Sequence, residues 1–305
     1  MKKMRWLASA FLFTLIAVIS VRAQDSYPLL TRCVDPQLQQ GLEEELSSLG
    51  LEQAAQRKSL SVALVDITDP ASPRLAAVNG NEMMYAASLP KIAILLGAFE
   101  RISRGEMAGD QETLDKLTDM IRRSSNQAAT EMLNRVGKRF LADLLQSPRY
   151  RLYDRTRNGG LWVGKGYASA PAWKRDPLHH LSHGATALQT ARFYYLLETG
   201  RLVSPAFSKE MKTILGEPAI HHKFVKGLEK ARPGSHVFRK SGTWHQFHAD
   251  SALVERDGRR YIAVALAQNP RGGEWLSRLI VALDDLIFRS GPAAARYARL
   301  HDATR

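Results

Sequence analysis

Three short strings in the chain carry residue types that could act together in nucleophilic catalysis. They are Ser88-Leu89-Pro90-Lys91, Ser124-Ser125-Asn126 and Lys240-Ser241-Gly242. Ser88 and Lys91 are three positions apart, so on a helix they would share one face. A lysine that is desolvated and crowded by other cations can lose its proton and then accept one from a serine hydroxyl. The first string therefore predicts Ser88 as a nucleophile and Lys91 as its base.

Each string taken alone is a weak signal. A serine at the start of a helix is usually an N-cap, Ser-Ser-Asn is usually a turn, and Lys-Ser-Gly is usually the end of a strand. In a chain of this length about one S-x-x-K is expected by chance. The catalytic interpretation rests on the three occurring together, in order, each beside an element that could position it.

Apolar periodicity predicts the elements that must position these strings. Strands are expected over 60–67, 74–78, 236–241, 250–255 and 260–267. Helices are expected after Asp35-Pro36, from Ser88 onward, on both sides of Ser124-Ser125-Asn126, over 185–198, after Ser204-Pro205 and around 275–286. Ser88 would then open a buried helix, and Lys240 would lie on a strand.

Residues 149–184 show no sustained period and are rich in Gly, Arg, His and aromatic residues. The aromatic residues Trp162, Tyr167 and Trp173 favour a long ordered loop. The order of the elements predicts an α+β fold, because strands at both ends of the chain enclose a helical block. We expect an antiparallel five-stranded sheet flanked by helices, with an all-helical lobe over roughly 88–220.

In residue type and in order, the three strings match the S-x-x-K, S-x-N and K-[ST]-G elements of the penicillin-recognising serine hydrolases. From about Leu60 to the last helix, the chain resembles a class A β-lactamase-related member of that group. In that family the nucleophile opens a helix after the first strands, and K-[ST]-G lies on a strand beside it. The resemblance implies a β-lactamase-like fold and a hydrolase that forms an acyl-enzyme.

The resemblance also implies roles for individual residues. The amides of Ser88 and Thr243 would form the oxyanion hole that stabilises the tetrahedral intermediate. Ser124 would relay a proton to the leaving nitrogen, and Asn126 would bind the amide of the substrate's side chain. Ser125 stands where the family commonly has Asp, which puts the local rigidity of this turn in question.

The third string is interpreted as the part of the site that holds a substrate carboxylate. Lys240 offers a fixed cation beside that carboxylate, Ser241 donates a hydroxyl, and Gly242 leaves room for close approach. The substrate is therefore expected to be a small-molecule β-lactam or a peptidoglycan stem peptide.

Two departures from the family pattern concern the shape of the cleft and the release of the acyl group. The stretch between Lys91 and Ser124 is shorter than in typical β-lactamases, which predicts a more open site. The family's deacylating Glu should lie in the long loop, which contains no Glu. Asp176, before Pro177, is a possible deacylation base, although its carboxylate reaches one methylene less than that of Glu. The alternative is a cap or a salt bridge to an arginine.

The N-terminus is typical of a secretory signal. Basic residues precede an apolar run over 6–21, and Ala23 ends a cleavage site. The run is shorter than the roughly 18 to 20 residues that span a bilayer, although a retained anchor is the alternative. We expect a signal peptide over 1–23, a mature hydrolase domain over 24–305, and a periplasmic or secreted location without a stable membrane anchor.

Charge and composition exclude other classes of function. The formal net charge is +13, and loss of the four basic residues in the signal would leave +9. The basic residues are scattered rather than gathered in a stripe, which argues against nucleic acid and favours an anionic cell-wall polymer or an acidic small substrate. The single cysteine, Cys33, excludes an internal disulfide. The histidines of the long loop lack the Glu of H-E-x-x-H, so we expect no metal there. We also expect no cofactor, and we expect the protein to be a monomer.

The leading hypothesis is an exported serine hydrolase that resembles a β-lactamase. A D,D-peptidase or penicillin-binding protein carries the same strings, and a binding protein that acylates without turnover is the third alternative. Since the loop lacks Glu, acylation is expected to outrun hydrolysis.

Overall fold

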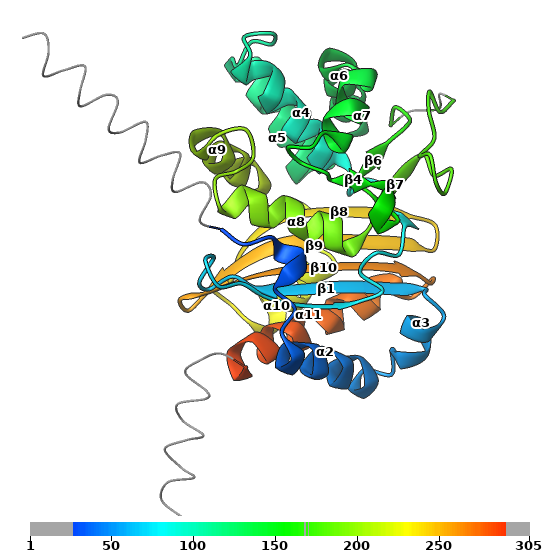
Figure 1. Ribbon diagram of the computed structural model, residues 1–305, viewed down its shortest axis with the longest axis vertical. Coiled ribbons are helices and arrows are strands. Elements are labelled where there is room, and N and C mark those ends of the chain that lie inside the picture. The colour runs from blue at the N-terminus through cyan, green and yellow to red at the C-terminus, as the bar shows by residue number, and fades with distance from the viewer. Residues whose placement is uncertain (1–26, 168, 170, 291–305) are drawn as a thin grey trace, which may run out of the picture.

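The structure, a computed structural model, describes residues 27–167, 169 and 171–290. It consists of a sheet with helices on both faces and a group of helices on one side (Figure 1). The strands are β1 (Leu60–Asp66), β2 (Arg74–Val78), β3 (Met84–Tyr85), β4 (Tyr153–Asp154), β5 (Gly159–Gly160), β6 (Trp162–Val163), β7 (His183–Ala185), β8 (His236–Trp244), β9 (Phe247–Arg256) and β10 (Arg259–Gln268). The helices are α2 (Pro36–Ser48), α3 (Glu52–Gln56), α4 (Lys91–Ser103), α5 (Gln111–Arg122), α6 (Asn126–Val136), α7 (Lys138–Gln146), α8 (Ala187–Glu198), α9 (Pro205–Leu215), α10 (Phe224–Ala231) and α11 (Gly272–Arg289), with 3-10 turns η1 (Leu30–Arg32) and η2 (Arg155–Arg157).

The central sheet is antiparallel throughout, with strand order β2-β1-β10-β9-β8. The first and last thirds of the chain meet in it, because β1 pairs with β10 from Leu60 opposite Ala267 to Asp66 opposite Tyr261. Strand β8 is the edge of the sheet on the side of the helical group. All residues of β1 are buried, since helices cover both faces of the sheet.

Alternate residues of each strand supply two separate cores. Val62 and Leu64 of β1 belong to a core shared with α2 and α11. Ala63 and Val65 belong to the core shared with α8 and the helical group. The helical group therefore packs on one face of the sheet through α8, which lies between them in Figure 1.

The α+β class and the antiparallel five-stranded sheet are confirmed. The hairpin of β8 and β9 is longer than expected, because its turn consists of His245 and Gln246, which carry no Gly or Asn-Gly signal. His245 instead adopts a left-handed backbone with φ 48°. The long loop over 149–184 contains the short strands β4, β5, β6 and most of β7, which pair with one another and with β3.

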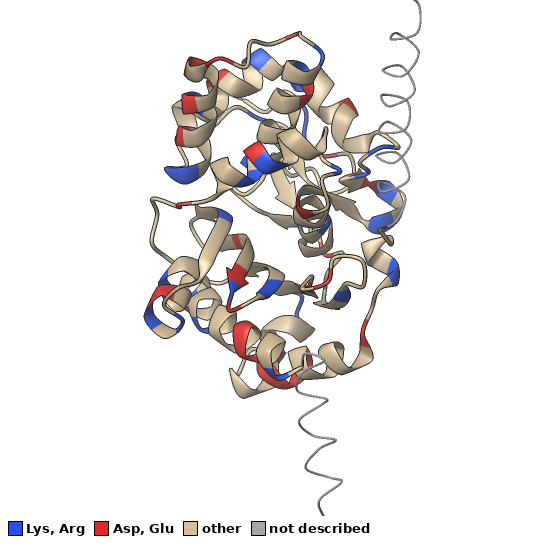
Figure 2. Ribbon diagram, turned by 90° about the vertical axis from the view of Figure 1, so that its left-hand side faces the viewer, with Lys and Arg blue, Asp and Glu red and all other residues tan. Residues whose placement is uncertain are grey.

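The expected signal peptide over 1–23 lies outside the described residues. In the part of the chain that the structure describes, no helix is long and apolar enough to cross a membrane. Lys and Arg are interspersed with Asp and Glu over both the sheet and the helical group (Figure 2).

Candidate active site

Ser88 lies in a tight turn between β3 and α4. The amide of Leu89 donates to the carbonyl of Ala86 at 3.0 Å, and that of Lys91 donates to the carbonyl of Ser88 at 3.2 Å. The expectation that Ser88 opens the helix was wrong by one turn, because α4 begins at Lys91. Pro90 is the N-cap of α4, and the chain before it is held by the bonds of the turn rather than by helical bonds.

Strand β8 passes directly against this turn at Gly242. A Cβ on Gly242 would lie 2.0 Å from the carbonyl oxygen of Ala86 and 2.8 Å from the amide nitrogen of Ser88. Gly242 is therefore required for contact with the turn that carries Ser88. Thr243, the next residue of β8, lines the same cavity as Ser88 and Asn126, with a volume of about 390 Å³.

Lys91 is fully buried beneath this cavity and is held by the turn between α5 and α6. Its Nζ donates to the carbonyl of Ser124 at 2.6 Å, to Asn126 Oδ1 at 2.8 Å, to the carbonyl of Ser125 at 3.2 Å and to Ser124 Oγ at 3.3 Å. Burial lowers the pKa of Lys91 to about 7, and the opposing charge of Asp119 raises it by less. A lysine with a pKa in this range is suited to serve as a general base at neutral pH.

Ser124 lies between two buried lysines. Its Oγ accepts from Lys240 Nζ at 2.9 Å as well as from Lys91. Burial, followed by the positive charge of Lys91, lowers the pKa of Lys240. The Ser124 backbone is left-handed, with φ 59°, a strained conformation of the kind that clusters at functional sites. The three side chains form a continuous chain of hydrogen bonds.

Ser125 and Asn126 begin helix α6. Ser125 is the N-cap, and its Oγ accepts from the amide of Ala128 at 3.2 Å. Ser125 thus caps the helix, a role for which Ser and Asp are both favoured. The effect of the missing Asp on local rigidity stays a prediction. The side chain of Asn126 lines the cavity and accepts from Lys91.

Lys240 and Ser241 are both buried, Lys240 with 1% and Ser241 with 5% of its surface exposed. Lys240 Nζ donates to the carbonyl of Ser241 at 2.8 Å in addition to Ser124 Oγ. Lys240 is thus connected to the cavity through Ser124. Its role, and that of Ser241, toward a substrate carboxylate stays a prediction.

Lys223 belongs to this region and was missed in the sequence. Its Nζ donates to the carbonyl of Gly242 at 2.5 Å, to Thr243 Oγ1 at 2.8 Å and to the carbonyl of Ala249 at 3.1 Å. Burial lowers its pKa to about 8, against the opposing charge of Asp250. Lys223 ties the end of β8 to β9, beside the proposed oxyanion hole. Its partners are mainly backbone carbonyls, so no residue pattern points to it.

Asp176 is fully buried and does not line the cavity of Ser88. Its Oδ1 accepts from Tyr153 OH at 3.0 Å and from the amides of Leu178 at 3.1 Å and His179 at 2.9 Å. Its Oδ2 accepts from the amide of Leu181 at 2.5 Å. These bonds occupy both oxygens in holding the loop together. The geometry favours the cap, the second of the two interpretations of Asp176.

We expect Asp176→Asn to leave the lifetime of an acyl-enzyme within about twofold of wild type while lowering the melting temperature. The new amide nitrogen cannot accept from the backbone, which leaves a buried donor unsatisfied at a cost of about 1 to 3 kcal/mol. Mass spectrometry of a penicillin adduct over time and a thermal melt measure the two effects. A tenfold longer adduct with unchanged stability would instead make Asp176 the deacylation base.

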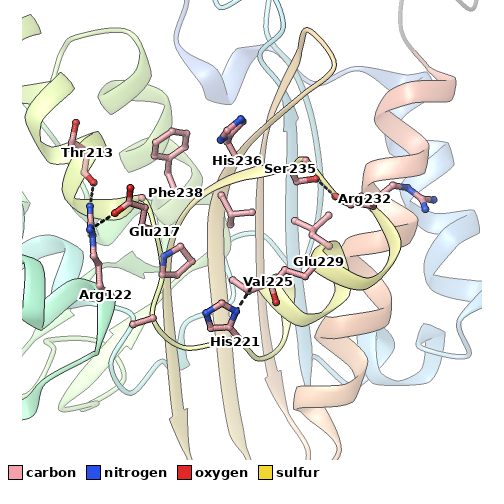
Figure 3. A pocket seen from close by; sticks show the side chains of 17 residues that line it. Arg122, Thr213, Glu217, His221, Val225, Glu229, Arg232, Ser235, His236 and Phe238 are labelled. Atoms are coloured by element: carbon pink, nitrogen blue, oxygen red, sulfur yellow. Dashed lines mark hydrogen bonds and ion pairs between the residues drawn. The ribbon is translucent and has the colours of Figure 1, made fainter.

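A larger hollow of about 850 Å³ lies between α9, α10 and the start of β8 (Figure 3). Its charged side chains are partly paired with each other, Arg122 with Glu217 at 2.6 Å and His221 with Glu229 at 2.6 Å. None of the residues of the three strings lines it. Among the described residues, no three His, Cys, Asp or Glu side chains are grouped as metal ligands.

Solved structures with this fold include β-lactamases and PBP-A. The crystal structure of a beta-lactamase from Sphaerobacter thermophilus matches with a TM-score of 0.63 and 15% identity, covering 82% of this chain and 96% of that chain. The structure of PBP-A matches with a TM-score of 0.59 and 18% identity, covering 83% and 97%. A mutant of PBP-A, solved as an acyl-enzyme complex with penicillin G, matches with a TM-score of 0.59 and 19% identity, covering 83% and 98%.

No curated protein matches the chain in sequence. The model of the beta-lactamase enzyme family matches residues 41–116 and 112–288, which is most of the chain. With this match and the fold, the chain belongs to the beta-lactamase enzyme family.

Proposed function

We propose that this protein is an exported serine hydrolase that forms an acyl-enzyme on Ser88 with a β-lactam or a related amide that carries a carboxylate. One observation carries the proposal: the buried Lys91 beneath the Ser88 cavity is bonded to both Ser124 and Asn126. A general base is most effective when its pKa lies near the working pH, and the pKa of Lys91 is lowered to about 7.

In the proposed acylation step, neutral Lys91 takes the proton of Ser88 Oγ as that oxygen attacks the carbonyl carbon of the amide. The amides of Ser88 and Thr243 stabilise the negative charge on the carbonyl oxygen. The carbon–nitrogen bond then breaks, and the leaving nitrogen takes a proton from Ser124 Oγ. Lys91 or Lys240 returns a proton to Ser124, since both bond to its hydroxyl.

Deacylation requires water to attack the ester carbon and lose a proton, after which the bond to Ser88 Oγ breaks and that oxygen is protonated again. No Asp or Glu is among the described residues that line the cavity. This favours slow release, as in a penicillin-binding protein or D,D-peptidase, over an efficient β-lactamase. The fold is shared with β-lactamases and with PBP-A, a mutant of which was solved as an acyl-enzyme complex with penicillin G, so it is compatible with both alternatives.

The deciding experiment mixes the purified protein with benzylpenicillin and follows its mass. We expect an adduct of the intact penicillin, mapped by peptide digestion to Ser88, which forms in a burst and decays slowly. A linear amide that ends in D-Ala-D-Ala and a chromogenic β-lactam, assayed in parallel, separate peptidase from lactamase activity. Absence of any adduct and of any turnover would reject the proposal.

The rate of acylation is expected to rise with pH and to level off above the pKa of Lys91, about 7. Below this pKa the base is protonated, so the rate should fall about tenfold for each pH unit. Stopped-flow acylation by a chromogenic β-lactam from pH 5.5 to 9 measures the profile. A rate that does not change over this range would contradict Lys91 as the base.

A further inference from the structure

The loop segment before β7 places one aromatic ring directly beside the catalytic lysine. The centroid of the Tyr167 ring lies 4.6 Å from Lys91 Nζ, within the range of a cation–π contact. On another side the ring packs against His183, with centroids 4.3 Å apart. The hydroxyl of Tyr167 is buried and has no hydrogen-bond partner among the described residues. Its ring, rather than its hydroxyl, makes the contacts.

A rigid frame fixes the ring in this position. The amide of Tyr167 donates to Thr130 Oγ1 at 3.0 Å, and Thr130 Oγ1 donates to the carbonyl of Asn126 at 2.9 Å. His183 Nε2 lies 3.1 Å from the carbonyl of Lys165, which can only accept, so this nitrogen carries the proton. Tyr167 is thus tied both to α6 and to β7.

The groups that line the cavity leave few bases for deacylation. Burial lowers the pKa of His183 to about 4, so its imidazole is a weak base, and its Nε2 donates to the carbonyl of Lys165. Lys91 remains the base that the proposed mechanism already uses. Its hydrogen bonds are directed to the turn between α5 and α6, and the Tyr167 ring covers another side of Nζ.

We propose that the ring of Tyr167 covers the acyl-enzyme: it fills the space beside Lys91 where a hydrolytic water would have to stand, and so sets the lifetime of the Ser88 ester. The inference rests on the proposed function, because it concerns the fate of the ester formed there. With the carbonyl oxygen held by the amides of Ser88 and Thr243, on the side of β8, water activated by Lys91 must approach from the side of the loop. Tyr167 stands on that side, as a positioning residue that excludes water.

Burial raises the pKa of the Tyr167 phenol well above its usual value, which disfavours the phenolate. The hydroxyl is therefore a poor base, and its removal should matter little. Loss of the ring, by contrast, opens a space lined by Lys91 and His183 that water can enter. Lys91 then accepts a proton from that water as its oxygen attacks the ester carbon.

A graded series tests the cover: Tyr167→Phe, Tyr167→Leu and Tyr167→Ala. Each protein is acylated with benzylpenicillin, freed of excess antibiotic and followed by mass spectrometry as the adduct decays. We expect the Phe variant to keep the wild-type lifetime within about threefold, and the Leu and Ala variants to shorten it progressively, the Ala variant at least about tenfold, a modest share of what a positioned base contributes. If the Ala variant does not fold, the lifetime of the adduct in the Leu variant tests the proposal.

The outcomes separate this inference from the proposed function. If wild type forms no adduct at Ser88, the proposed function fails. If the adduct forms but the Leu and Ala variants release it no faster than wild type, the cover alone is rejected. If the Phe variant changes the lifetime as much as the Ala variant, the hydroxyl is the active group and the proposal is equally overturned. The acylation rate, measured separately, shows whether a variant has instead damaged the nucleophile.

Discussion

Ser88→Ala should abolish covalent labelling by benzylpenicillin and by other acylating probes. The variant lacks the oxygen that forms the ester in the proposed mechanism. Intact-protein mass spectrometry after prolonged incubation measures the labelled fraction. The expected fraction is indistinguishable from zero, with an unchanged melting temperature, since Ser88 lies in a turn at the surface of the cavity.

Ser103→Ala, on the helix that follows the turn of Ser88, is a matched control. Ser103 ends α4, at the opposite end from the catalytic turn, and its hydroxyl bonds only within the helix, to the carbonyl of Glu100 at 2.9 Å. This variant should label as wild type does. Equal labelling of wild type and Ser88→Ala, or an adduct on another serine, would remove Ser88 from the mechanism.

Lys91→Met should slow acylation by about 10²- to 10⁴-fold, the usual contribution of a positioned general base. Methionine has a similar length and no charge, so it fills the space without accepting a proton. Its effect on stability should be small, because relief from burying an ammonium offsets the loss of hydrogen bonds to Ser124 and Asn126. Stopped-flow acylation and a thermal melt measure the two quantities.

Lys209→Met, at an exposed position on α9, is the control for loss of a positive charge. It should acylate at the wild-type rate. A Lys91→Met protein that folds and acylates within threefold of wild type would show that another group accepts the proton of Ser88.

The sheet was predictable from the sequence because its residues alternate between two apolar cores. Val62 and Ala63, for example, face opposite cores, and a register shift of one residue would exchange them. The side chains of Lys91, Ser124, Asn126 and Lys240 were singled out by type and order, and the structure brings them into direct contact.

The contacts of three other residues could not be predicted from the sequence, because they depend on how distant segments of the chain pack together. Lys223 is positioned by carbonyls of β8 and β9 that any residues would supply. Asp176 is surrounded by backbone donors that become neighbours only once the loop has folded. Tyr167 was recognised as an aromatic anchor of the loop, but its contact with Lys91 depends on the tie between its amide and Thr130.

The contact of Gly242 with the turn of Ser88 also bears on how the protein acquires activity. These residues are separated by about half of the chain, and β8 is held in the sheet by β9, which pairs with β10. Contacts of such high sequence separation form slowly, because a long loop must close before they contribute any stability. The proposed nucleophile, Ser88, and the proposed oxyanion hole can therefore assemble only after the C-terminal strands have paired. We therefore expect that a chain that is still being synthesised cannot be acylated at Ser88. Acylation of Ser88 would report that the whole domain has folded, rather than that the helical group alone has formed.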